Sequence, residues 1–387
     1  MNIELTIEKL VFGGDGLGFV DGKAYFIEGA LPGEKVLARI TNDKKNYGKA
    51  RLIKVLSPSP ERLTPPCPYV QSCGGCQYQH IRYTDELRWK ELQVRESFAQ
   101  TIRIDPALIQ PIRQGPREYH YRQSITLHRT AKNNQKPSPL AFIGRDNRSF
   151  VFIQNCLLAG ESLQSVFKEL HTLGKYETKR VFKIAENGAI VSSEEDKLYR
   201  IRLADELFWA HSKGFFQNNL EVTQQVVEEL QNIVEMVKPS RFIDLYSGVG
   251  TFAALAGSQA QEIFCFEESI YAVECLKRNL KERQLPGAIF KGRVEQTFPN
   301  FWLGNQKEGS LVLLDPPRLG ITYDLASFFA KADKMKNIIY LACDLQILIR
   351  DLKIILSKGR YQIKTIVPFD MFPRTKHLEV LAWLEQI

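Results

Sequence analysis

The chain has 387 residues, which is enough for two or three domains. Its composition, 44% hydrophobic and 25% charged, is that of a globular protein and argues against a disordered or fibrous chain. No apolar run reaches the roughly 20 residues that a membrane-spanning helix needs, so we expect no membrane partner. The formal net charge of +8 fits a polyanionic partner, above all a nucleic acid.

The first residues and the cysteine count predict a cytoplasmic protein. Residues 1–8 are acidic and alternate apolar with polar side chains, so they lack the basic and then apolar order of a signal peptide. The seven cysteines are an odd number, and without a signal peptide we expect them to be thiols in a reducing compartment.

Residues 1–57 are expected to form a small β-barrel. Apolar and polar residues alternate at 3–7, 24–27 and 34–40, which is typical of strands. The glycine-rich run 13–18 is followed by no helix, so it predicts a strand-joining turn rather than a phosphate loop. Short strands with glycine turns indicate an OB-like barrel, a fold that often binds oligonucleotides. The basic residues between 44 and 54 fit contact with phosphates, although a solvated strand edge explains them equally well.

Residues 58–212 are expected to form a mixed α+β central domain. A Ser/Pro-rich linker at 57–60 precedes it, and a helix is expected over residues 84–101. Strand-like runs and one polar turn follow, the strands at 121–129, 140–153 and 180–192 and the turn at 132–137.

From residue 213 to residue 387, helices alternate with strands. An apolar stripe between Leu220 and Val237 predicts a helix. Strand-like runs follow at 241–246, 262–266, 287–290, 310–314, 337–342, 360–367 and 378–384. This alternation predicts a doubly wound α/β sheet.

Four cysteines predict a metal centre. Cys67, Cys73 and Cys76 lie in one short loop with the spacing C-x5-C-x2-C, and two glycines let that loop turn tightly. Cys156 is the best candidate for a fourth ligand, because the next two cysteines fall inside the α/β unit. Four thiolates suit zinc or an iron–sulfur cluster, and the three-plus-one spacing favours [4Fe–4S].

A glycine-rich turn predicts a nucleotide-type cofactor. The apolar strand 241–246 runs into Gly248 and Gly250, which allow a ligand to approach the backbone closely. The next strand ends at Glu267, which is placed to bind a ribose diol. No Walker lysine follows, so ATP hydrolysis is disfavoured. S-adenosylmethionine, a nucleoside cofactor without phosphates, fits best, although two carboxylates that only cap helices remain an alternative.

Three further residues stand at strand ends. Asp315 follows a buried strand and opens the run Asp-Pro-Pro-Arg. Cys343 follows the next strand, where it would face a ligand cleft as a nucleophile or be buried as a small apolar residue. Glu379 precedes an apolar run, where it is either a desolvated base or a strand-edge surface residue.

Together these features resemble the RNA 5-methyluridine methyltransferases, in the iron–sulfur branch with a TRAM domain that acts on 23S ribosomal RNA. The resemblance covers nearly the whole chain. It rests on the cysteine loop and on motifs in family order, namely Tyr121-Arg122, Phe216-Gln217-Asn218-Asn219, Asp244 to Gly250, Asp315-Pro316-Pro317-Arg318, Cys343, Met371-Phe372-Pro373 and His377-x-Glu379. It implies a TRAM barrel, a central RNA-binding domain and a Rossmann-like class I methyltransferase sheet.

The resemblance also implies roles for particular residues. It places S-adenosylmethionine among Gln217, Tyr246, Thr251, Glu267 and Asp315. It makes Cys343 the nucleophile and Glu379 the base. The chain departs from the family at Ala342–Leu345, where the usual motif reads Ser-Cys-Asn-Pro, and we expect the charge of Asp344 to raise the pKa of the thiol unless a cation offsets it. It departs again at Arg293, where the family usually has Asn or Asp near the adenine.

The predicted activity is methyl transfer from S-adenosylmethionine to C5 of a uridine in RNA, most simply 23S ribosomal RNA, by a monomer. One alternative is methylation of uridine 54 in tRNA, and another is methyl transfer to an exocyclic amine of a purine. That purine reaction needs neither a cysteine nor a terminal glutamate, and its usual motif ends in Tyr or Phe where this chain has Arg318. A third alternative is a catalytically weak relative that only binds RNA, for which the change at 342–345 is the support.

Overall fold

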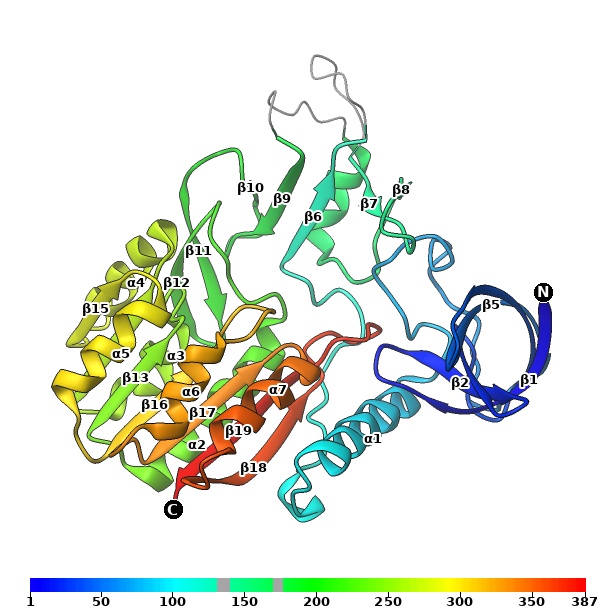
Figure 1. Cartoon of the computed structure of the whole chain (residues 1–387). Coiled ribbons are helices and arrows are strands. Elements are labelled where there is room, and N and C mark those ends of the chain that lie inside the picture. The colour runs from blue at the N-terminus through cyan, green and yellow to red at the C-terminus, as the bar shows by residue number, and fades with distance from the viewer. Residues whose placement is uncertain (131–139, 170–176) are drawn as a thin grey trace.

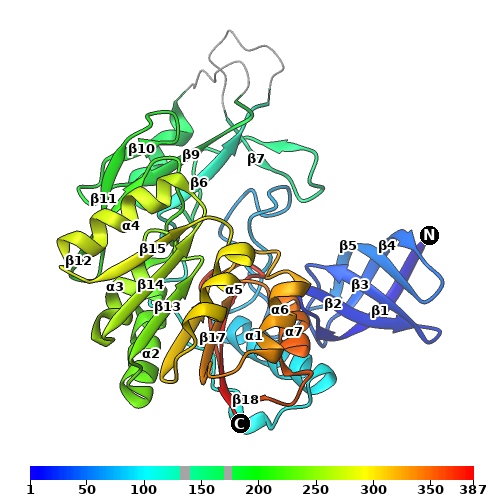
Figure 2. The same cartoon turned by 60° about the vertical axis from the view of Figure 1, so that its left-hand side comes forward.

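The amino-terminal part of the chain is a closed five-stranded barrel. The computed structural model describes residues 1–130, 140–169 and 177–387, so the polar turn predicted at 132–137 lies outside the described residues. The barrel order is β1-β2-β3-β5-β4, and its strands are β1 (Asn2–Leu10), β2 (Asp15–Val20), β3 (Lys23–Glu28), β4 (Lys35–Asp43) and β5 (Tyr47–Ser57). Alternate residues point inward, as the alternation in the sequence predicts. Both views place the barrel at one end of the molecule (Figures 1 and 2).

The glycine-rich run is a strand-joining turn, as predicted. Gly13 and Gly14 have positive φ angles between β1 and β2. Gly18 lies in β2, where a Cβ atom would stand 2.4 Å from the carbonyl oxygen of Thr6. This glycine is therefore required by the close approach of two barrel strands.

The middle of the chain contains one long helix and several short strands. The helices are α1 (Tyr83–Thr101), η1 (Pro106–Leu108) and η2 (Glu161–Lys168), and the strands are β6 (Ser124–His128), β7 (Phe142–Ile143), β8 (Phe150–Val151), β9 (Lys179–Ile184), β10 (Ile190–Ser192), β11 (Leu198–Leu203) and β12 (Glu206–His211). The strand-like run 140–153 holds only the two-residue strands β7 and β8. It is interrupted because Asp146 accepts hydrogen bonds from the backbone of Arg148 and Ser149, which closes a turn.

The carboxy-terminal part is a seven-stranded sheet between two layers of helices. The strand order is β15-β14-β13-β16-β17-β19-β18. The strands are β13 (Arg241–Leu245), β14 (Glu262–Glu267), β15 (Gly287–Lys291), β16 (Ser310–Leu314), β17 (Asn337–Ala342), β18 (Tyr361–Phe369) and β19 (Glu379–Gln386). The helices are α2 (Leu220–Val237), α3 (Thr251–Leu255), η3 (Gly257–Gln259), α4 (Ile270–Glu282), α5 (Val294–Asn305), α6 (Tyr323–Lys331) and α7 (Leu345–Leu356). Among the described helices, none is long and apolar enough to cross a membrane.

Successive side chains of each strand enter opposite helical layers. In β13, Phe242 packs with α2 and α3, whereas Ile243 packs with α5, α6 and α7. Helix α1 joins the second layer through Val94 and Phe98. Because both faces are covered, the strands read as apolar runs rather than as alternating patterns. The predicted doubly wound α/β sheet is confirmed, with one strand, β19, running antiparallel to its neighbours.

Candidate active site

The predicted site residues come together at one edge of the seven-stranded sheet. Strands β13, β14, β16 and β17 are parallel, so the residues at their carboxyl ends share that edge. They place Tyr246, Glu267, Asp315 and Cys343 there. Gln217 reaches the same edge, because its Nε2 donates a hydrogen bond to Oδ2 of Asp315 at 3.4 Å.

Glu379 reaches this edge because β19 is antiparallel. Ala342, the last residue of β17, is paired with Val380. Glu379 is the first residue of β19 and therefore lies beside Cys343, the residue that follows β17. The structure thus brings together the two side chains that the resemblance makes nucleophile and base.

Cys343 and Glu379 are both shielded from water. Burial, and then the charge of Glu379, raise the pKa of the half-buried Cys343 thiol to about 12, while Arg318 opposes the rise. Glu379 is 7% exposed, and its Oε1 has no hydrogen-bond partner among the described residues. Burial, and then the charge of Asp315, raise the pKa of Glu379 well above its ordinary value. A desolvated carboxyl of this kind is suited to take up a proton.

Asp344 does not set the pKa of the thiol in the way expected. Its Oδ1 accepts hydrogen bonds from the backbone N–H groups of Gln346 at 3.0 Å and Ile347 at 3.2 Å, so the carboxylate caps helix α7. The pKa of Cys343 is raised, but by burial and by Glu379. Asp344 is therefore not among the main causes of the raised pKa, and a cation, Arg318, opposes the rise.

The glycine turn after β13 leaves its backbone open. Gly248 has φ +54°, and a Cβ atom there would meet nothing within 4 Å. Its N–H donates to Oε2 of Glu267 at 2.9 Å. Gly250 is required by packing instead, because a Cβ atom there would stand 2.3 Å from the side chain of Leu276.

The two other predicted cofactor residues lie beside this turn in the chain. Thr251 is the first residue of α3 and is buried. The hydroxyl of Tyr246 donates a hydrogen bond to Glu295 at 2.9 Å.

Three carboxyl groups surround this turn. Asp244 is fully buried, and burial raises its pKa well above the ordinary value, with Asp315 and Glu267 adding to the rise. Its Oδ1 has no partner within the described chain. Burial raises the pKa of Asp315 to about 7. A cationic ligand would relieve this crowding of negative groups, which fits the sulfonium of S-adenosylmethionine.

The raised pKa of Asp315 has a consequence for stability. Because burial raises the pKa of Asp315 in the folded state, the protonated form of Asp315 contributes to the free energy of unfolding. This contribution is fully present below the pKa of Asp315 in the unfolded chain and is lost as the pH rises through about 7. We expect Asp315→Asn, which stays neutral, to unfold several degrees higher than the native protein at pH 8, with a smaller gap at pH 5. Thermal unfolding of the ligand-free proteins checks this, and a variant that is less stable at pH 8 would contradict it.

The four predicted metal-ligating cysteines line one cavity. Cys67, Cys73, Cys76 and Cys156 all border a cavity of about 340 Å³, together with Arg122. Burial raises the pKa of Cys76 to about 12, and the guanidinium of Arg122 opposes the rise. The Nε of Arg122 is buried and has no partner among the described residues. Within the part of the chain that the structure describes, no three such side chains lie close enough to hold a single metal ion.

Two charged side chains, one at the site and one in a strand near the turn before Gln217, were given no role by the sequence. Arg318 is the cation that lowers the pKa of both Cys343 and Glu379, and its place in the Asp-Pro-Pro-Arg motif was the available signal.

Lys183 in β9 is buried, and its Nζ donates to the carbonyls of His211 at 3.1 Å, Ser212 at 2.7 Å and Gly214. These bonds hold the turn that leads to Gln217. No local pattern distinguishes this lysine from a surface residue of a strand.

Comparison with known families agrees with this geometry. Residues 2–53 match the TRAM domain model, and residues 302–387 match the model for tRNA (Uracil-5-)-methyltransferase. The crystal structure of Pyrococcus abyssi tRNA (uracil-54, C5)-methyltransferase in complex with S-adenosyl-L-homocysteine superposes with a TM-score of 0.73 at 21% identity, over 98% of this chain and 99% of that one. At this identity the likeness shows the shared fold.

Curated relatives match over nearly their whole length. An RNA methyltransferase of Bdellovibrio bacteriovorus, Bd3828, is 30% identical over 99% of this chain and 94% of its own. The 23S rRNA (uracil(1939)-C(5))-methyltransferase RlmD of Vibrio cholerae is 29% identical over 98% of this chain and 94% of its own. The chain therefore belongs to the S-adenosylmethionine-dependent RNA (uracil-C5)-methyltransferases, among the members that carry an amino-terminal TRAM domain.

Proposed function

We propose that this protein methylates C5 of a uridine in 23S ribosomal RNA, with Cys343 as nucleophile and Glu379 as base. The observation that carries the proposal is the placement of these two side chains. A thiol and a carboxyl with raised pKa values lie next to each other at the sheet edge that also carries the open glycine turn and its three carboxyl groups. Methyl transfer to a purine amine needs no such pair.

The chemistry requires a group that makes C5 nucleophilic. S-adenosylmethionine supplies an electrophilic methyl group when it is bound. The Cys343 sulfur, as the thiolate, forms a bond to C6 of uracil, and the electrons of the C5–C6 double bond move toward the C4 carbonyl oxygen. These electrons return through C5 to form the bond to the methyl group, and the methyl–sulfonium bond breaks with its electron pair left on the departing sulfur. Glu379 removes the proton from C5, those electrons restore the double bond, and the C6–S bond breaks to release Cys343 as a thiolate.

Arg318 is suited to support both catalytic residues. Its positive charge lowers the pKa of the thiol and of Glu379, and so favours the ionised forms that attack C6 and accept the C5 proton. We assign Gln217, Tyr246, Thr251, Glu267 and Asp315 to the cofactor, as the resemblance implies. Gln217 holds Asp315 through a hydrogen bond, and Glu267 accepts from the backbone of Gly248, so the carboxylates are oriented before the ligand arrives.

The rest of the chain is proposed to hold the RNA. The barrel, residues 1–57, and the central domain, residues 58–212, precede the methyltransferase domain, residues 213–387. A uridine in a duplex hides C6, so the target must lie in a loop or be flipped out of its stack. The choice of 23S ribosomal RNA follows the Vibrio cholerae relative, and tRNA remains the second candidate because of the Pyrococcus abyssi structure.

One assay tests the activity and both substrates. Transcripts of 23S ribosomal RNA and of tRNA are incubated with the protein and methyl-labelled S-adenosylmethionine, digested and separated as nucleosides. We expect labelled 5-methyluridine from the ribosomal transcript. Label in 5-methyluridine from tRNA alone would overturn the substrate, and a methylated purine or no label would overturn the reaction.

We further propose that the four cysteines hold a [4Fe–4S] cluster. The donor set is four thiols around one cavity, and the unpartnered Nε of the buried Arg122 at that cavity fits an anionic group. Each cysteine of such a cluster binds a different iron, so the sulfurs lie farther apart than ligands of a single ion. When bound, the cluster would link Cys156 to the loop 67–76 and order the central domain. No step of methyl transfer passes through it.

Metal analysis tests the cluster. We expect anaerobically purified protein to be brown with about four iron atoms per chain, and Cys156→Ser to lose most of the iron. The matched control is Cys275→Ser, because Cys275 is a buried thiol packed against β11 and β12, away from the cavity. Stoichiometric zinc, or full iron content in Cys156→Ser, would contradict the proposal.

A further inference from the structure

The segment that precedes the proposed base is buried although it has no regular secondary structure. Residues 370–378, here called the base segment, connect β18 to β19 and end directly before Glu379. Asp370, Thr375 and Leu378 in it are at most 1% exposed, and Arg374 is 4% exposed. A buried irregular segment must find partners for its backbone elsewhere in the chain.

Four consecutive carbonyl groups of the base segment are held by distant parts of the chain. The carbonyl of Met371 accepts from the side chain of Asn219 at 3.1 Å, and that of Phe372 accepts from Nζ of Lys90 at 3.4 Å. The carbonyl of Pro373 accepts from the hydroxyl of Tyr121 at 3.0 Å. The carbonyl of Arg374 accepts from the backbone N–H groups of residues 77 and 78, both at 3.1 Å, directly after the cysteine loop.

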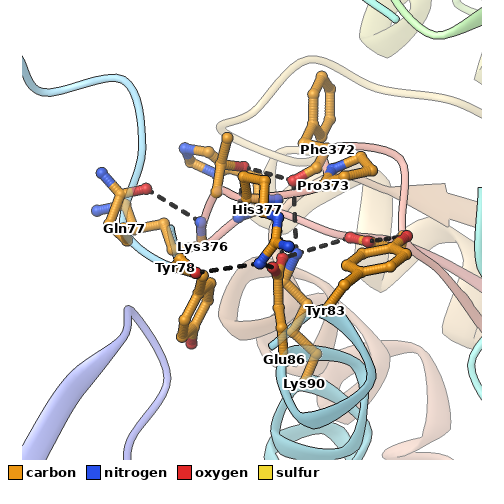
Figure 3. Close-up of polar contacts among 12 residues, drawn as sticks. Gln77, Tyr78, Tyr83, Glu86, Lys90, Phe372, Pro373, Lys376 and His377 are labelled. Atoms are coloured by element: carbon orange, nitrogen blue, oxygen red, sulfur yellow. Dashed lines mark hydrogen bonds and ion pairs between the residues drawn. The ribbon is translucent and has the colours of Figure 1, made fainter. Parts of the chain in front are cut away.

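Helix α1 carries the charges that fix this segment. Lys90 and Glu86 are fully buried, and Nζ of Lys90 lies 2.7 Å from Oε1 of Glu86 and 2.6 Å from Oδ1 of Asp370. Figure 3 shows both side chains of α1 pointing toward the base segment. The hydroxyl of Tyr83 donates to the other oxygen of Asp370 at 2.8 Å. Buried ion pairs gain little net stability, so such a network fits geometric control of the segment.

Arg374 is the centre of this arrangement. Its backbone N–H donates to Oε1 of Glu86 at 2.8 Å, and its guanidinium contacts the carbonyl of Ile81 at 2.7 Å and the carboxylate of Glu118. Its φ angle is +65°, a left-handed conformation that a residue with a side chain adopts only when its surroundings impose it. The interactions of Arg374 therefore determine the path of the chain five residues before Glu379.

We propose that Arg374 is a positioning residue, which acts through the base segment to hold Glu379 against Cys343. This inference rests on the proposed function. If Arg374 has this role, one residue joins the base segment to the chain directly after the cysteine loop, since the carbonyl of Arg374 accepts from the backbone of residues 77 and 78. Arg374 itself forms no bond with substrate in this account.

The test compares adduct formation with turnover. In Arg374→Gln we expect the rate of 5-methyluridine release to fall about 10- to 100-fold while the affinity for S-adenosylmethionine stays within about twofold, because a displaced base fails at proton removal. A covalent protein–RNA adduct should then accumulate during turnover. Arg374→Lys, which keeps the charge, should recover part of the rate. Tyr121→Phe removes the hydroxyl that donates to the Pro373 carbonyl and also contacts the side chain of Arg122, and it should show a smaller effect in the same direction.

The control is a partly buried arginine at the opposite edge of the sheet. Arg241 pairs with Glu262 at 2.7 Å at the start of β13, so Arg241→Gln loses a comparable ion pair away from the site. It should lower stability without adduct accumulation. Glu379→Gln is run in parallel. If Glu379→Gln accumulates adduct and neither Arg374→Gln nor Tyr121→Phe does so, only the positioning role of Arg374 is overturned and the proposed function is not. If Glu379→Gln itself gives no adduct, the proposed function is overturned.

Discussion

Replacing Cys343 with alanine is expected to abolish both methyl transfer and any covalent RNA adduct, because no other group at the site can saturate the 5,6 double bond of uracil. Glu379→Gln is expected to behave differently. The nucleophile remains, so attack and methyl transfer proceed, but the C5 proton stays in place and elimination stalls. An adduct that survives denaturing electrophoresis should therefore accumulate in Glu379→Gln and be absent in Cys343→Ala.

The structure offers a matched control for the cysteine. Cys265 is a fully buried cysteine of β14 that contacts neither Cys343 nor Glu379 in the pairing of the sheet. Cys265→Ala should keep turnover at a temperature below its melting point. Normal 5-methyluridine formation by Cys343→Ala would show that the nucleophile and the mechanism are both wrong.

Replacing Glu267 with alanine is expected to weaken S-adenosylmethionine binding by about 1.5–3 kcal/mol, or roughly 10- to 150-fold. Glu267 ends β14 and accepts from the backbone of Gly248 and Ser269, so its carboxylate is fixed beside the open glycine turn, where a ribose hydroxyl would donate to it. Calorimetric titration measures the change.

Glu262→Ala is the control for this titration. Glu262 begins the same strand at the opposite edge, where it pairs with Arg241 and Lys307. Its removal should leave cofactor affinity unchanged. If Glu267→Ala bound the cofactor as tightly as Glu262→Ala does, Glu267 would have no place in the site.

The sequence predicted the architecture well wherever the information was local. The barrel followed from alternation, and each of the seven sheet strands was placed within two residues of its observed start. The site edge followed from the rule that ligands meet the carboxyl ends of parallel strands. That rule covers Glu267, Asp315 and Cys343 but does not cover Glu379, which is the first residue of its strand. The position of Glu379 depends on the antiparallel direction of β19. The sequence of a strand does not show whether it runs parallel or antiparallel to its neighbours.

The charges that control the site were not predictable, because they depend on contacts between distant segments. No local pattern indicates that Glu86 and Lys90 are buried, yet both are fully buried against a segment about 280 residues later in the chain. The main causes of the raised pKa of Cys343 were not predictable for a related reason. A carboxylate beside a thiol in sequence turned away to cap a helix, whereas Glu379, far away in sequence, approached the thiol.

Tritium release from RNA that carries [5-³H]uridine tests the central claim most directly, since it follows the bond that Glu379 is proposed to break. With unlabelled S-adenosylmethionine, the native protein should release one tritium for each methyl group transferred, Glu379→Gln should transfer methyl groups without matching release, and Cys343→Ala should do neither. Methyl transfer by the native protein with the tritium retained in the RNA would contradict methylation at C5.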